Sequence, residues 1–148
     1  MPIQQTATTS FKVELLQAVH NFGPTSPNTF KIALYTAAAS IGPSTTVYTT
    51  SNEVVGTGYT AGGNTLTIST SPTSGNNVSG VATAYVSFAN STWSNATFTA
   101  RGALIYNSTQ GNKSVAVLDF GSDKTVNDDT FQIIFPTADA NSAIVRIS

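Results

Sequence analysis

The only histidine of this 148-residue chain, His20, is its most suitable side chain for acid–base chemistry. A serine nucleophile needs a neighbouring base and an oxyanion hole, yet the sequence offers no second histidine and no Gly-x-Ser-x-Gly elbow. With no cysteine, the chain cannot form a disulfide or a thiolate metal site. We therefore expect no catalytic, cofactor-binding or metal-binding residues, no cofactor, and no enzymatic activity.

Carboxylates are the remaining candidates for chemistry, and four lie close together in the sequence: Asp119, Asp123, Asp128 and Asp129. Together with backbone carbonyls they could bind Ca²⁺, but their spacing matches no known calcium loop, so we interpret them as solvated turn residues. Two of them, or Glu53, could also serve a small glycan hydrolase. A sugar cleft normally offers several aromatic side chains, and the chain has one tryptophan.

The glycine-rich stretch from Gly56 to Gly63 has neither the dinucleotide-binding spacing nor the Gly-Lys-Ser/Thr ending of a phosphate loop. We interpret it as a tight turn between strands. Trp93 and Arg101 are residue types enriched in protein interfaces. Trp93 could equally be a core residue that closes a sandwich.

Charged residues make up only 9% of the chain, against about 25% in ordinary globular proteins. The formal net charge of −1 offers no basic excess for nucleic acid or for a membrane surface. The N-terminus lacks the pattern of a signal peptide, and no apolar run is long enough to span a membrane. We expect a protein made in a cytoplasm, with a short-chained polar surface suited to close packing.

One helix is predicted over residues 10–22, because Phe11, Leu15, Leu16, Val19 and Phe22 recur at helical spacing. Ser10 is the expected N-cap, His20 would lie in the last turn, and Gly23-Pro24 would end the helix. Residues 1–9 are predicted to be either a disordered tail or an arm that orders on a partner.

The rest of the chain, residues 30–148, is predicted to be a β body. Residues 30–35 alternate as a half-buried strand, residues 36–63 form long ordered loops, and further strand segments follow, each bounded by turn residues: 65–69, 81–88, 98–106, 114–120, 131–135 and 143–147. Residues 103–106 and 115–120 should form a hairpin. The predicted fold is one mainly β domain: an antiparallel β-sandwich or jelly-roll-like barrel with one N-terminal α-helix.

Three stretches, taken together in this order, resemble a family of small proteins of tailed bacteriophages: residues 11–16 running into 30–35, then 56–63, then 100–107 with 117–121. The resemblance implies a virion protein. Within such a family, a short, cysteine-free, low-charge β domain looks most like the decoration or cement proteins that bind and stabilise the outside of the head shell. The alternative is a neck, tail or fibre component, including a receptor- or glycan-binding module built from exposed aromatics and the loops over residues 36–63.

These expectations identify a class of binding partner and a candidate interface. The partner would be the major capsid protein or another virion protein, and the chain itself would be a homo-oligomer, with a trimer favoured. The candidate interface residues are Phe11, Leu15, Val19, Phe22, Trp93 and Arg101, together with the arm. The helix could instead simply cap its own sandwich.

Overall fold

The fold is mainly antiparallel β, as predicted, and forms an open sandwich that does not close into a barrel. The computed structural model describes residues 2–148. One sheet has the strand order β1-β7-β6-β2-β3 and the other β4-β5-β8. The elements are β1 (Thr6–Ala7), α1 (Thr9–Leu16), β2 (Phe30–Tyr35), β3 (Asn64–Leu66), β4 (Ile68–Asn76), β5 (Ala82–Phe88), β6 (Ser91–Asn107), β7 (Lys113–Ile133) and β8 (Val145–Ile147).

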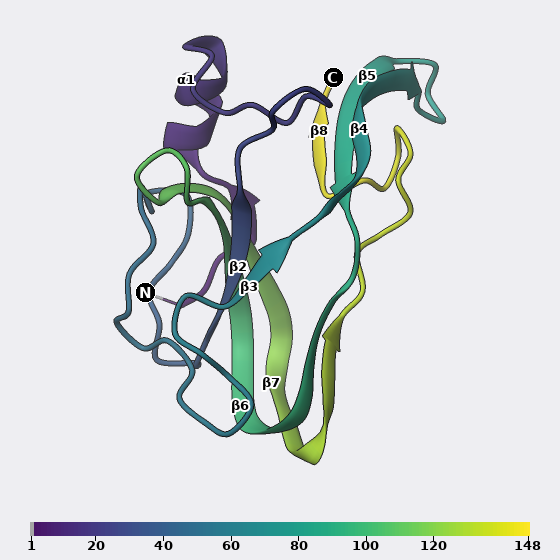
Figure 1. The fold of residues 1–148 in the computed structure, drawn as a ribbon. Helices are drawn as coiled ribbons and strands as arrows, with labels where there is room; N and C mark the ends of the chain where they lie inside the picture. Colours follow the sequence, from purple (N-terminus) through teal and green to yellow (C-terminus); the bar gives the residue numbers. More distant parts are fainter. Residues whose placement is uncertain (1) are drawn as a thin grey trace.

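Strands β6 and β7 form the longest hairpin of the fold. Its upper part pairs Ala103 with Leu118 and Ile105 with Ala116, which confirms the predicted hairpin. The two strands have 17 and 21 residues, well beyond the usual 3–10. They bend sharply at the lower end of Figure 1, so that one hairpin contributes to both layers.

Turns were predicted at positions where this hairpin in fact continues. Asn95, Gly121 and Asp128 have positive φ, and the pairing register shifts near Asn95 and Asp128. Turn-forming residues therefore produce bulges and a bend within long strands here, because a bulge adds a residue to one strand without ending the ladder. A bulge and a turn use the same residue types, so composition cannot distinguish them.

Strand β2 is buried on both faces, so the prediction of a half-buried strand is wrong. Phe30, Ile32 and Leu34 face the main core between the sheets. Ala33 and Tyr35 face a second apolar cluster, formed with Ile3, Ala39, Ile41, Leu104, Tyr106 and Val117. The N-terminal arm and the loop over residues 36–63 cover this second face, which no local sequence pattern predicted.

Helix α1 is shorter than predicted and begins earlier. Its N-cap is Thr8 rather than Ser10, with the Thr8 hydroxyl accepting from the backbone N–H of Phe11. It ends at Leu16 in a Schellman motif, where the N–H of Val19 donates to the carbonyl of Glu14 and that of Ala18 to the carbonyl of Leu15. Ala18 takes the left-handed conformation, with φ of 58°. Gly23-Pro24 is therefore not the helix stop.

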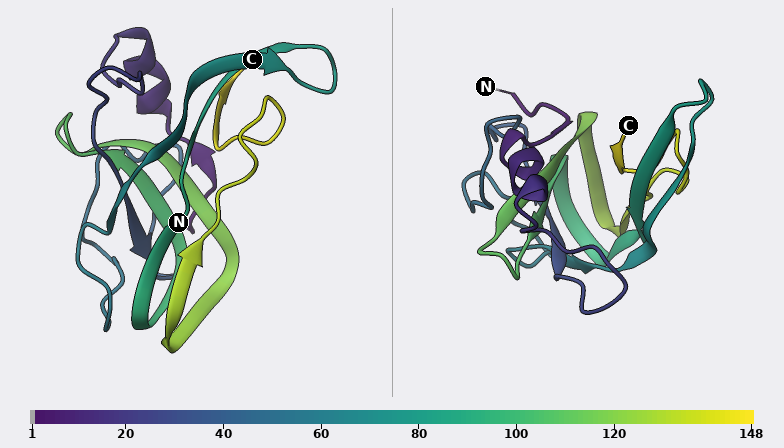
Figure 2. Two further views of the ribbon diagram at one scale, coloured as in Figure 1. Left: turned by 45° about the vertical axis from the view of Figure 1, so that its right-hand side comes forward. Right: turned by 90° about the horizontal axis from the view of Figure 1, so that it is seen from above.

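The N-terminal arm folds onto its own chain, which corrects the prediction of a free tail or a partner-bound arm for residues 2–9. Ile3 is buried, and the N–H of Gln4 donates to the carbonyl of Ile41. Strand β1 pairs Thr6 with Val117 and Ala7 with Ala116 of β7. Met1 lies outside the described residues. Seen from above in Figure 2, the arm and α1 lie on one side of the sandwich and β8 on the other, with the layers splayed between them.

Candidate functional site

His20 is locked in a buried polar cluster and does not lie in the last turn of a helix. Its Nε2 is 2.7 Å from Oε2 of Glu14, and Lys113 Nζ donates to the other Glu14 oxygen at 3.1 Å. The amide nitrogen of Asn107 is 3.0 Å from Nδ1 of His20. The histidine side chain is fully covered and both ring nitrogens are occupied. The cluster therefore ties the helix end to the start and end of the β6–β7 turn.

Glu53 occupies a second buried cluster, which fixes the long loop before β3. Its carboxylate accepts from the hydroxyls of Tyr48 and Tyr59 at 2.6 Å each and from the N–H of Gly62 at 2.7 Å. The hydroxyl of Tyr106 donates to the Gly62 carbonyl. All the polar groups of this cluster hold the loop against the sheet. The carboxylate is thus engaged in structural hydrogen bonds.

Burial raises the pKa values of the tyrosines around Glu53. It raises the pKa of Tyr106 to about 12, with a further contribution from the Glu53 charge. Burial, and then the same carboxylate, also holds the pKa of Tyr35, Tyr48 and Tyr59 well above the usual 10. These hydroxyls stay protonated as hydrogen-bond donors over the whole neutral range.

The glycine-rich stretch is needed for close backbone approach. A Cβ at Gly63 would lie 1.8 Å from the carbonyl oxygen of Ile32, and Gly63 has φ of 70°. A Cβ at Gly56 would lie 2.4 Å from the carbonyl oxygen of Thr97. These glycines let the loop lie directly on the sheet, which agrees with the interpretation of the stretch as a turn region.

The candidate interface residues separate into buried and accessible ones. Phe11, Phe22 and Trp93 are core side chains, so their assignment to an interface must be corrected. Phe22 stacks on Phe30 at 4.2 Å between ring centroids, which explains why the chain turns back after α1. Leu15 and Val19 are partly exposed. Arg101 is half-buried and pairs with Asp119 at 3.3 Å.

The clustered aspartates do not converge. The N–H of Gly121 and then the Arg101 guanidinium lower the pKa of Asp119. Asp123, Asp128 and Asp129 are exposed along the outer part of β7. Over residues 2–148, no three His, Asp or Glu side chains come together in a way that could hold a metal ion. The same residues include no helix with the length and hydropathy needed to cross a membrane.

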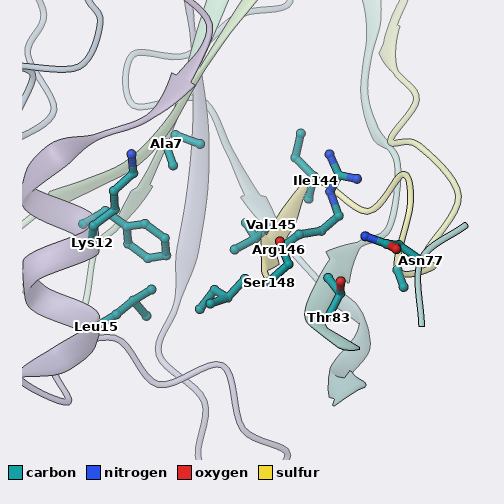
Figure 3. A pocket seen from close by; sticks show the side chains of 13 residues that line it. Ala7, Lys12, Leu15, Asn77, Thr83, Ile144, Val145, Arg146 and Ser148 are labelled. Carbon is teal, nitrogen blue, oxygen red and sulfur yellow. The ribbon is translucent and has the colours of Figure 1, made fainter. Parts of the chain in front are cut away.

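The main solvent-accessible feature of the surface is a row of three adjoining hollows on the side where the two layers of the sandwich are splayed apart, which we call the open side. A cavity of about 360 Å³ lies between α1 and β8, with Phe11, Lys12 and Leu15 on one side and Val145, Arg146 and Ile147 on the other. Figure 3 shows these walls facing each other. We call it the α1–β8 groove.

Two more hollows adjoin this groove. One, of about 500 Å³, is lined mainly by apolar residues of β7 and the segment after it, and shares Ile144 with the groove. The other, of about 320 Å³, shares Leu15, Val145 and Ile147 with it. The gap between the layers is thus accessible along much of the open side.

Exposed apolar side chains gather at the end of the molecule where the groove lies. Leu16 is 92% exposed and Val78 is 91% exposed; Val13, Val81 and Ile147 are also exposed. They belong to α1, the β4–β5 turn and β8, which all lie toward the upper end of Figure 1, with α1 on the left, the β4–β5 turn on the right and β8 between them. We call these five residues the apical patch. Exposed apolar side chains on several elements at one end of a molecule are candidates for contact with a partner.

Sequence reasoning did not find this site or the two buried clusters. Glu14 and Lys113 are 99 positions apart, and nothing local marks them as partners. The apical patch joins residues from three separate elements, each of which looks ordinary by itself. No protein-family description, curated protein or solved structure matches this chain.

Proposed function

We propose that this chain is a structural protein of a tailed-bacteriophage virion: a decoration protein that binds the outside of the head shell and stabilises it. The observation that carries the proposal is the apical patch, five exposed apolar side chains on three elements at one end of a chain with very few charges. Leu16 and Val78 are almost fully exposed, so burying them against a neighbour would remove apolar surface from water.

The mechanism of such a protein is mechanical. Each copy binds through its apical end and bridges neighbouring shell subunits. Several copies joined around a local symmetry axis, with a trimer as the favoured state, multiply a modest contact by avidity. The rigid clusters around Glu14 and Glu53 hold the loops and helix in place under load. No residue has to act chemically in this mechanism.

The alternative of a receptor- or glycan-binding module at the neck, tail or fibres has no specific observation in its favour. Such a module would be favoured by Trp93 and Tyr59 exposed in one groove. Trp93 is only 3% exposed, and the two rings pack 6.2 Å apart against the core.

The experiment adds purified chain to heads assembled without it and measures co-sedimentation. Leu16→Asn should weaken binding at least about tenfold, because a buried leucine contributes about 1.5–3 kcal/mol. The matched control is Val55→Asn, since Val55 is 94% exposed but lies in the loop before β3, outside the patch. Wild-type chain that stays in the supernatant, or an equal loss with Val55→Asn, would contradict the proposal.

A further inference from the structure

Strand β8 presents an unused edge to the α1–β8 groove. It is the last strand of the sheet β4-β5-β8, and over residues 2–148 no strand pairs with its outer edge. The groove separates this strand from α1 (Figure 3). Unpaired backbone N–H and C=O groups on an edge strand are a template to which an extended peptide can add.

The walls of the groove suit an added strand. Leu15, Ile144 and Ile147 line the groove and are at least partly exposed, so they supply apolar contacts for side chains that point inward. Ala7, Ala116 and Ala140 also line it, and their small side chains leave room for a backbone to approach. Side chains of a strand alternate between its two faces, so an occupant would place every second residue against this apolar wall.

The groove also carries two basic side chains that have no acidic side chain beside them. Lys12 of α1 and Arg146 of β8 both line it, and Figure 3 shows them on opposite sides. Within residues 2–148 neither forms an ion pair, whereas Arg101 and Lys113 do. No Asp or Glu side chain lines the groove. Two uncompensated cations beside a free edge favour an acidic occupant.

We propose that the α1–β8 groove binds an extended segment of a partner protein, which adds as a strand beside β8. The segment has apolar residues at alternate positions and carboxylates that pair with Lys12 and Arg146. The inference rests on the proposed function in one respect: the partner that supplies this segment would be a shell subunit. Strand addition gives affinity through the backbone, and the two cations select the sequence.

The test is an NMR titration of the whole isotope-labelled chain with two blocked peptides. One is Glu-Val-Thr-Val-Glu and the other Lys-Val-Thr-Val-Lys. The acidic peptide should shift the amide signals of residues 144–148 and α1, and should bind at least about fivefold more tightly than the basic one. Lys12→Glu should abolish that preference. The control Lys124→Glu makes the same charge change on β7, in the adjoining hollow but outside the lining of the α1–β8 groove, and should keep the preference.

Three results would overturn the inference: no shift with the acidic peptide at millimolar concentration, equal binding of both peptides, or loss of preference with Lys124→Glu. A chain that ignores both peptides but shows shifts of residues 144–148 on dilution would identify a second copy as the occupant instead. Because the titration uses no virion, its failure leaves head binding standing. Conversely, absence of the chain from virions would leave a positive titration intact.

Discussion

Glu53 is the residue whose hydrogen bonds hold the long loop before β3 in its conformation. It accepts three hydrogen bonds, two of them from tyrosine hydroxyls that must stay protonated to donate. Tyr106 joins the same cluster through the Gly62 carbonyl. The sequence drew attention to Glu53 as a possible catalytic acid, but its role follows from partners that only the fold brings together.

This cluster predicts a loss of stability at high pH. Tyrosines ionise near pH 10 in the unfolded chain, whereas the pKa of Tyr106 is raised to about 12 in the folded one. Its contribution is therefore complete below pH 10 and is lost as pH rises through about 12. The loss is at most about 1.4 kcal/mol per pH unit for each shifted tyrosine.

Urea unfolding between pH 8 and pH 12 measures this effect. The free energy of unfolding should be level to about pH 10 and fall above it. Tyr106→Phe, which removes one ionising hydroxyl, should be less stable at neutral pH but should show a shallower fall. A decline that begins near pH 8, or none by pH 12, would contradict the account of the cluster.

At the scale of elements, the sequence predicted which segments are strands better than where they end. β2 was predicted over its full length and β5 to within a residue, because both have alternating apolar residues between clear turns. β6 and β7 were cut short, since Asn95, Gly121 and Asp128 form bulges and a bend instead of turns. The helix end was misplaced because the helix is terminated by Ala18 in the left-handed conformation, which alanine rarely adopts.

Ala18 gives a direct test of that helix end. A non-glycine residue in the left-handed conformation is strained, and glycine removes the strain. Ala18→Gly should raise the free energy of unfolding by about 0.5–1 kcal/mol despite the extra freedom of the unfolded chain. The neighbour Gln17 has φ of −91°, so Gln17→Gly should lower it by a similar amount. Thermal and urea unfolding would show this; destabilisation by both variants would refute the assignment.

At the scale of the whole molecule, the open side of the sandwich is the feature that the sequence did not reveal. Composition and strand spacing predicted an antiparallel sandwich or a jelly-roll-like barrel, and the structure shows the sandwich, with no closed barrel. They could not predict that one bent hairpin would contribute to both layers, or that α1 and β8 would enclose a groove. That arrangement depends on contacts such as Phe22 against Phe30 and β1 against β7, which join distant parts of the chain.

The central claim is the proposed place of this chain in a phage virion, and the measurement that tests it most directly is cryo-electron microscopy of purified virions of the phage from which the proposal would have it come. The account predicts many copies on the outer lattice of the head, with α1, β8 and the β4–β5 turn directed at the shell and each copy touching more than one shell subunit. A few copies at the neck, tail or fibres, or none in the virion, would contradict it.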